Sequence, residues 1–301
     1  MKIFKIFLAT LLAVIAALSV LAYWQINQLE VEEITPDLHV IYGLGGNVAV
    51  LRTGAGTVIV DTMTFKMQGD LIRDKAQALT GEPVAVVINT HYHSDHTHGN
   101  PAFPADTRVI ATERTLHHLN TTDADYFSDR DAALLPNETI ESREMIRIGN
   151  KTLHLIHPGR GHTDGDLVVL FQEDQTVHLG DLFFNHLYPN IDLEGGGSVQ
   201  AWGDSLDQIL ILSFDKLIPG HGSLAIREDL QQFQRFIRQL ATLSKKAATD
   251  NLPLETFLAN SGLTEDEGYN EVHMVIPIGL NRSFVLRRGW EEATGNYHPR
   301  D

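Results

Sequence analysis

Apolar residues in the first part of the chain form short runs that end at glycine-rich or polar turns. The run Val84–Ile88 is continuously apolar, which is typical of a strand buried on both faces. The turn residues Gly43–Gly46 and Gly54–Gly56 separate three earlier runs. We expect strands at residues 38–42, 47–53, 57–61, 84–88 and 107–112, and a helix over residues 65–79.

The second part of the chain repeats this rhythm. Turns at Gly149-Asn150 and Glu173-Asp174 predict paired strands, and helical spacing of apolar residues follows later. We expect strands at residues 144–148, 151–156, 166–172, 176–179 and 215–218, and helices over 198–212 and 225–248. Because no low-complexity linker divides residues 31–301, the pattern predicts one domain of two similar β-rich halves, each flanked by helices. This is a four-layer α/β sandwich.

The N-terminus has a different pattern. A basic start, MKIFK, precedes an uncharged apolar run from Ile6 to Trp24. The run predicts a signal peptide or an N-terminal membrane anchor over residues 1–24, with membrane attachment through residues 6–24 in the second case. Val20-Leu21-Ala22 offers only a weak cleavage site, so both alternatives stay open. Because the basic residues precede the run, we expect an exported protein, periplasmic or anchored to the outer face of the cytoplasmic membrane.

Composition narrows the classes of function. The 301 residues are 43% apolar and 21% charged, which indicates a folded protein with a sizeable core. The net charge of −16 disfavours nucleic acid as a partner. The chain has no cysteine, so disulfides, thiolate zinc ligands and thiol nucleophiles are excluded. The oligomeric state stays open.

The strand expected at Val84–Ile88 leads into a cluster of histidine and aspartate. The sequence His91-Tyr92-His93-Ser94-Asp95-His96 begins two residues after the strand, where α/β proteins place ligands. His91 and His93 lie on the same side of an extended backbone and can share one metal ion, and Asp95 and His96 can hold a second. Later strands are also followed by ligand-type residues, each beside a glycine: His162, Asp181 and His221.

The motifs HYHSDH, GHTDGD, GD at 180–181 and PGHG occur in this order and together resemble the metallo-β-lactamase superfamily over roughly residues 37–225. The resemblance implies an αββα sandwich with two zinc ions at one edge of the two sheets. It implies one zinc ion on His91, His93 and His162, a second on Asp95, His96 and His221, and a bridging Asp181. Asp95 and Asp181 would be the catalytic residues, and Asp61 would orient a metal-bound histidine.

Two divalent ions held close together share a hydroxide whose pKa falls towards neutral. We therefore expect hydrolysis of an ester, thioester, lactone or amide bond in a small-molecule substrate by a metal-bridging hydroxide. Two zinc ions, one hydroxide and the carboxylates of Asp95 and Asp181 leave one net positive charge, which would attract an anionic or carbonyl group. Asn185, His186 and Tyr188 follow Asp181, and we expect them to help line the substrate pocket.

The alternative is a class B β-lactamase that hydrolyses β-lactam antibiotics. Predicted export favours it, and the helix around Ala201–Leu206 resembles one in those enzymes. Against it, the best-known subclass has cysteine where Asp181 stands, and a lysine three residues later that binds the carboxylate of the drug. Phe184 occupies that place here. Arg160 is the first candidate for a substitute cation, and iron or manganese in place of zinc also stays open.

Overall fold

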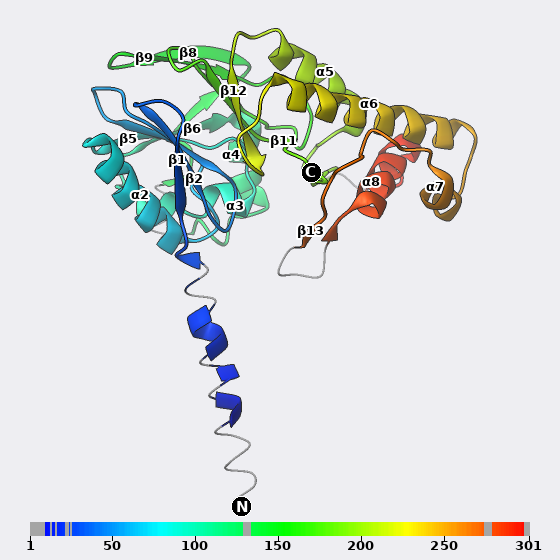
Figure 1. Ribbon diagram of the computed structural model, residues 1–301, viewed down its shortest axis with the longest axis horizontal. Coiled ribbons are helices and arrows are strands. Elements are labelled where there is room, and N and C mark those ends of the chain that lie inside the picture. Colours follow the sequence, from blue (N-terminus) through cyan, green and yellow to red (C-terminus); the bar gives the residue numbers. More distant parts are fainter. Residues whose placement is uncertain are drawn as a thin grey trace, which may run out of the picture.

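The structure is a computed structural model that describes residues 10–12, 14–15, 17–21, 24, 26–128, 134–273 and 279–297. Within these residues, two large β-sheets form the centre of the protein (Figure 1). The first sheet contains, in spatial order, β1 (Glu30–Glu33), β2 (Leu38–Tyr42), β3 (Val48–Leu51), β4 (Thr57–Val60), β5 (Val84–Ile88), β6 (Arg108–Thr112) and β7 (Glu138–Ile140). The second contains, in spatial order, β12 (Lys216–His221), β11 (Thr176–Phe184), β10 (Val168–Phe171), β9 (Lys151–Ile156) and β8 (Arg143–Ile148).

The central strands are apolar on both sides because both of their faces are covered. In β3, Ala49 and Leu51 belong to the core between the two sheets, whereas Val48 and Val50 face the helical side of the first sheet. Alternate residues of a strand point to opposite faces, so a strand covered on both sides is apolar throughout. This explains the unbroken apolar run of β5 as well.

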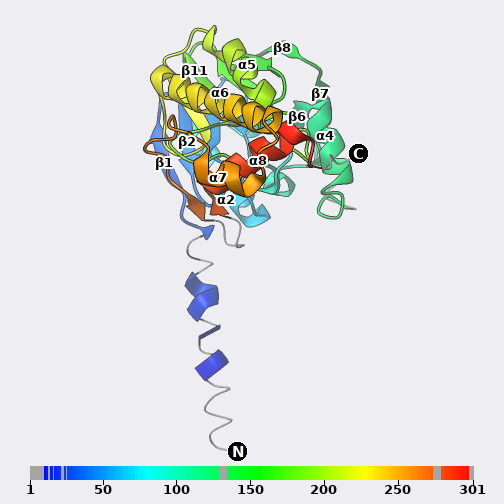
Figure 2. The same ribbon diagram turned by 90° about the vertical axis from the view of Figure 1, so that its right-hand side faces the viewer.

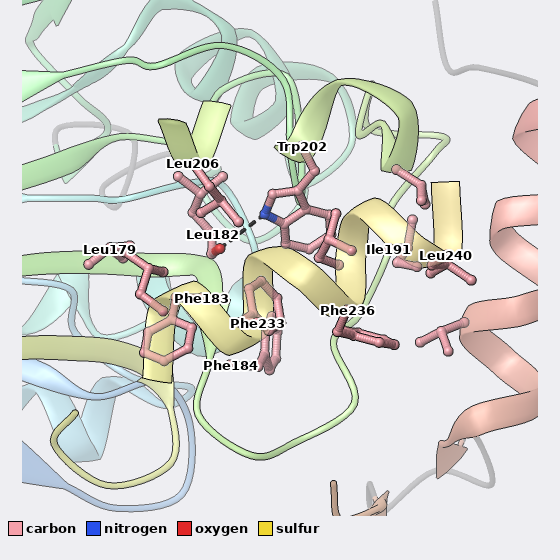
Figure 3. Packing of buried hydrophobic residues seen from close by; sticks show 14 of the residues in the cluster. Leu179, Leu182, Phe183, Phe184, Ile191, Trp202, Leu206, Phe233, Phe236 and Leu240 are labelled. Atoms are coloured by element: carbon pink, nitrogen blue, oxygen red, sulfur yellow. Dashed lines mark hydrogen bonds between the residues drawn. The ribbon is translucent and has the colours of Figure 1, made fainter. Parts of the chain in front are cut away.

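Helices cover the outer face of each sheet, which confirms the predicted four-layer αββα sandwich. Helix α2 (Lys66–Thr80) packs on the first sheet, and α5 (Val199–Leu210) and α6 (Arg227–Thr249) pack on the second (Figures 1 and 2). Figure 3 shows Trp202 of α5 against Phe233 of α6, with the Trp202 indole donating a hydrogen bond to the Leu182 carbonyl at 3.0 Å. The C-terminal helix α8 (Arg282–Thr294) packs against α5 and α6.

The predicted strands and helices are confirmed, with shifts of a few residues at their ends. The largest difference is β11, which continues to Phe184 instead of ending at residue 179. Sequence patterns missed β1, because its residues EVEE are all exposed and carry no apolar signal. They also missed the other elements α3 (Ser94–Thr97), η1 (Asn100–Ala102), α4 (Glu113–Thr121), β7, α7 (Leu254–Asn260), β13 (Val272–His273), β14 (Gly279–Leu280) and α8.

The apolar N-terminal run is described only in part, at residues 10–12, 14–15, 17–21 and 24. Among the residues that are described, no helix is both long enough and apolar enough to cross a bilayer. The signal peptide or anchor over residues 1–24 stays a prediction.

Candidate metal centre

The seven predicted metal ligands come together where loops from both sheets meet. We define the first group as His91, His93, His162 and Asp181, and the second group as Asp95, His96 and His221. Within each group, the possible ligand atoms lie within 4.8 Å of one another. The first sheet supplies the residues that follow β5, and the second sheet supplies Asp181 from β11 and His221 from the end of β12.

Asp181 lies between the two groups and turns one carboxylate oxygen toward each. Its Oδ2 atom is 3.8 Å from Nε2 of His91 and 3.5 Å from Nε2 of His162. Its Oδ1 atom is 3.1 Å from Nε2 of His96 and 3.3 Å from Nε2 of His221. This arrangement suits a carboxylate that bridges two cations.

Irregular pairing along β11 brings Asp181 to this place. The register between β11 and β12 shifts on either side of Gly180, whose φ of 52° lies in the left-handed region that favours glycine. A Cβ atom on Gly220 would lie 2.0 Å from Oδ1 of Asp181. The β12 backbone therefore reaches the carboxylate only because residue 220 is glycine.

Hydrogen bonds fix which ring nitrogens of the first group face inward. Nδ1 of His162 donates to the Asn190 carbonyl at 2.9 Å, and Nε2 of His93 donates to Asp192 at 3.0 Å. The two remaining nitrogens, Nε2 of His162 and Nδ1 of His93, face each other at 2.9 Å. Burial lowers the pKa of His162 to about 4, so its Nε2 atom carries a lone pair at neutral pH.

Asp61 orients the second group. It is fully buried, and its Oδ2 atom accepts a hydrogen bond from Nδ1 of His96 at 2.7 Å. The backbone N–H and hydroxyl of Thr90 both donate to Asp61 at 2.8 Å, and the Thr90 hydroxyl lies 3.1 Å from Nδ1 of His91. Asp61 has a φ of 64°, an unfavourable value for a residue with a side chain. The contacts of its carboxylate with Thr90 and His96 hold this conformation.

The carboxylates of Asp95 and Asp181 are ionised at neutral pH. Burial alone would raise the pKa of Asp181, but the charges of His221 and His96 outweigh it and hold that pKa well below its ordinary value. Burial lowers the pKa of His221, but Asp181 and Asp95 outweigh it and raise that pKa to about 10. The second group therefore attracts positive charge strongly.

The donor atoms fit a divalent metal ion. Nε2 of His91, Nε2 of His96 and Oδ1 of Asp181 are buried and have no hydrogen-bond partner among the residues that the structure describes, whereas buried polar atoms are normally paired. Imidazole nitrogen and carboxylate oxygen are ordinary zinc ligands. His93 and His162 add a pair of facing nitrogens that need a cation or a proton between them. The site is therefore suited to a metal cofactor.

The side chains expected to line the substrate pocket have partners within the protein. The amide of Asn185 donates to the Ser223 carbonyl at 3.1 Å, and the hydroxyl of Tyr188 donates to Asp266 at 2.8 Å. Tyr188 is only 7% exposed, and His186 points toward Asp229 with 3.6 Å between Nε2 and Oδ1. None of the three is among the described residues that line the cavity beside His93, and their role in the substrate pocket stays a prediction. These contacts connect residues 185–188 with Ser223, Asp229 and Asp266.

A cavity of about 480 Å³ adjoins the first group, and Tyr92, His93 and Asp192 form part of its wall. Phe284 and Arg288 of α8 form another part. Arg288 is the one guanidinium among the described lining residues, and three groups of the protein hold it. It is paired with Glu194, and it donates to Glu291 at 2.8 Å and to the Ile191 carbonyl at 3.0 Å.

Arg160, the candidate cation from the sequence, directs its guanidinium toward the backbone of a neighbouring loop. Its Nε atom donates to the Gly196 carbonyl at 2.6 Å, and its Nη2 atom donates to the Gly197 carbonyl at 2.9 Å. Phe184 is buried and stacks on His221 with 5.3 Å between ring centroids. Phe184 offers no cation, and Arg160 is not among the described residues that line the cavity beside His93.

Sequence reasoning missed Thr90, Asn190, Asp192 and Arg288. Asp192 stands shortly before the glycines at 195–197, and an acid beside a glycine-rich loop was the available signal. Asn190 acts through its backbone carbonyl, which no sequence pattern marks. Arg288 lies far beyond the last motif, and nothing in the sequence connects it with the site.

Comparisons with known proteins agree with the fold and the site. Residues 41–221 match the sequence model of the metallo-beta-lactamase superfamily. A metallo-beta-lactamase type 2 from Bacillus sp. (strain 170) is 25% identical over 59% of this chain and 67% of the relative. An atrochrysone carboxyl ACP thioesterase from Aspergillus fumigatus is 23% identical over 62% of this chain and 53% of that protein.

Among solved structures, a metallo-beta-lactamase from Pontibacter korlensis superposes with a TM-score of 0.61 and 20% identity. The superposition covers 70% of this chain and 99% of that one, and it supports the fold. Because the family match spans more than half of the chain and includes all seven candidate ligands, this chain belongs to the metallo-beta-lactamase superfamily and is a metal-dependent hydrolase.

Proposed function

We propose that the chain is a dinuclear zinc hydrolase that cleaves an ester, thioester, lactone or amide bond in a neutral small molecule. The position of Asp181, with one oxygen toward each group, is the observation that carries this proposal. His91, His93 and His162 would hold one ion, Asp95, His96 and His221 the other, and Asp181 both. Two zinc ions bound there supply a hydroxide nucleophile near neutral pH and polarise the scissile carbonyl.

Hydrogen bonds within the chain fix the ring protons away from the expected ligand atoms. Asp61 holds a proton on Nδ1 of His96, and the Asn190 carbonyl holds one on Nδ1 of His162, so that both Nε2 atoms stay available as ligands. Phe184 covers one face of His221 and also lies 6.0 Å from His162, centroid to centroid. These apolar contacts limit water on the protein side of the site and strengthen its electrostatic interactions.

The charge of the site favours a neutral substrate. The carboxylates of Asp95 and Asp181 are candidate ligands, and those of Asp61 and Asp192 contact ligand histidines. Two divalent ions (+4), these four carboxylates (−4) and the hydroxide (−1) leave one net negative charge. The surplus positive charge expected from the sequence counted only Asp95 and Asp181, and it disappears once the other two are included. Arg288 is already paired and adds no free charge.

A class B β-lactamase remains the second candidate, because a relative of that name matches the chain. Its substrates carry a carboxylate that needs a fixed cation, and a hydrogen bond to a charged group contributes about 1.5–3 kcal/mol. Loss of that contact would lower kcat/KM by about ten- to a hundredfold.

A substrate panel tests the choice. Zinc-loaded protein would be assayed with a neutral aryl ester, an acyl thioester, a lactone and a chromogenic cephalosporin, with and without a chelator. We expect chelator-sensitive hydrolysis, with the best neutral substrate ahead of the cephalosporin by at least about tenfold in kcat/KM. Cephalosporin turnover above that of every neutral substrate would favour the β-lactamase, and no turnover of any substrate would contradict both.

We also propose that the protein is exported, on the basis of Lys2, Lys5 and the uncharged run from Ile6 to Trp24. Cell fractionation tests this proposal. Full-length protein in the cytoplasm would contradict it, whereas a mature N-terminus near Tyr23 would indicate a cleaved signal peptide rather than an anchor.

A further inference from the structure

Helix α8 lies outside residues 41–221 of the family match, yet it contacts the loop beside the first group. Nε of Arg288 donates to the Ile191 carbonyl at 3.0 Å, and the same guanidinium pairs with Glu194 in that loop. One turn further along the helix, Glu292 accepts hydrogen bonds from the Ser198 hydroxyl and from the Gln200 backbone N–H. The helix therefore holds both ends of the segment 191–200.

Ile191 stands between the two residues that orient imidazoles of the first group. The Asn190 carbonyl accepts the Nδ1 proton of His162, and Asp192 accepts the Nε2 proton of His93. The Asp192 carboxylate is held further by the Tyr92 hydroxyl and by the Gly195 backbone N–H at 2.9 Å. A displacement of this short stretch would rotate both rings.

We propose that Arg288 is a positioning residue for the first group. Its guanidinium binds the Ile191 carbonyl and Glu194, and so fixes the position of the segment that begins at residue 190. The Asn190 carbonyl and the Asp192 carboxylate then stay within hydrogen-bond distance of His162 and His93. The side chain of Arg288 is 13% exposed and is also held by Glu291 at 2.8 Å, so the contact is confined rather than solvated. The inference rests on the metal assignment of the proposed function and makes no use of the substrate.

Metal affinity tests the proposal directly. Arg288→Met keeps most of the side-chain volume and removes every donor. Arg287→Met, on the exposed neighbouring position, makes the same charge change without a contact to the loop. Zinc dissociation constants would be measured on the full chain by chelator competition. Loss of a group that orients a ligand typically costs ten- to a hundredfold in affinity. We expect about tenfold weaker binding in the first group for Arg288→Met and no change for Arg287→Met.

A cobalt-substituted sample assigns the change to a group. The Nε2 proton of His93 and the Nδ1 proton of His162 report on the first group in proton NMR, and the Nδ1 proton of His96 reports on the second. We expect faster solvent exchange of the first two signals only. A folded Arg288→Met that binds both ions as the wild type does would overturn the proposal, and so would equal weakening of both groups.

A further variant covers the case in which Arg288→Met does not fold. Arg288→Lys keeps the charge, but one ammonium group cannot reproduce the forked contacts with Glu194, Glu291 and the Ile191 carbonyl. We expect the same selective loss for it, and unchanged affinity would overturn the proposal. If the wild type binds no ion in the first group, the metal assignment of the proposed function fails instead.

Discussion

Nδ1 of His93 and Nε2 of His162 face each other at 2.9 Å, although each ring donates through its other nitrogen to a fixed acceptor. Two neutral imidazoles in this arrangement would oppose two lone pairs. Hydrogen bonds from the other nitrogen of each ring, to Asp192 and to the Asn190 carbonyl, hold the two rings in this arrangement. The pair is therefore prepared for a cation.

Removing one ligand should empty one group. His91→Ala removes a ligand of the first group, and His221→Ala removes a ligand of the second, so we expect each variant to retain about half of the zinc of the wild type after gel filtration. Metal analysis per folded chain measures this. Retention of the full wild-type zinc content by either variant would contradict the assignment of that histidine.

Asp181 should matter more for turnover than for folding. Asp181→Ala removes the carboxylate between the groups, so the separation of the two ions is no longer fixed, and misplacement of reacting groups costs about a hundredfold. The two sheets pack through an apolar core that does not involve Asp181, so the melting temperature should fall only modestly. Steady-state kinetics would measure the loss of turnover, and thermal unfolding would measure the change in melting temperature. Near-full activity would exclude a bridging role.

Asp61→Asn should weaken metal binding selectively in the second group. Asparagine tolerates the left-handed backbone of residue 61, so the fold should survive. With its amide nitrogen facing His96, it would donate a proton to Nδ1, and the ring proton of His96 would then move to Nε2, the ligand atom. We expect a ten- to a hundredfold loss of affinity there.

Asp123→Asn is the matched control, because Asp123 contacts His98, which is not a candidate ligand. Calorimetric zinc titration of both variants would measure the effect. Equal affinity in the two variants would show that Asp61 does not set the proton position of His96.

Much of this site could be predicted from sequence because its ligands follow strands. The run Val84–Ile88 is unmistakably a buried strand, and the cluster His91–His96 must then lie at its carboxyl end. The order of the motifs supplied His162, Asp181 and His221. The strands of both sheets could also be predicted. A strand that is covered on both faces is apolar throughout, and this leaves a clear signal in the sequence.

What the sequence could not predict depends on loops and on backbone atoms. The Asn190 carbonyl orients His162 whatever side chain residue 190 has. Arg288 reaches the site only because α8 folds back over a loop about a hundred residues earlier, and no local pattern specifies that approach. Tyr188 lies close to Asp181 in sequence, but its hydroxyl turns toward Asp266, and no local pattern specifies that direction.

Lys151 links the first strands to the second sheet and should contribute strongly to stability. Its ammonium group lies 3.1 Å from Asp37 and 2.8 Å from Asp174, whose side chain is 4% exposed. Lys151→Met leaves Asp174 without its cation, and we expect a loss of about 3 kcal/mol in the free energy of unfolding. The exposed pair of Lys66 and Asp70 provides the control, because Lys66→Met should cost less than about 1 kcal/mol.

The same lysine gives a pH dependence with a definite sign. Burial lowers the pKa of Lys151, but hydrogen bonds from its ammonium group to Asp174 and Asp37 outweigh burial and raise it. The stabilisation is therefore complete below the unfolded pKa of about 10.4 and is lost as the pH rises through the higher folded value. Denaturant unfolding should show a constant difference between wild type and Lys151→Met near neutrality that shrinks above about pH 10.4. A difference that grows with pH would contradict this assignment.

The proposed function requires Asp181 to join two metal ions held by two groups of histidine and aspartate. Diffraction from crystals of the zinc-loaded protein at the zinc absorption edge locates the ions directly. We expect two anomalous peaks, one bounded by His91, His93 and His162 and the other by Asp95, His96 and His221, with one oxygen of Asp181 on each. A single peak, or peaks away from these groups, would contradict it.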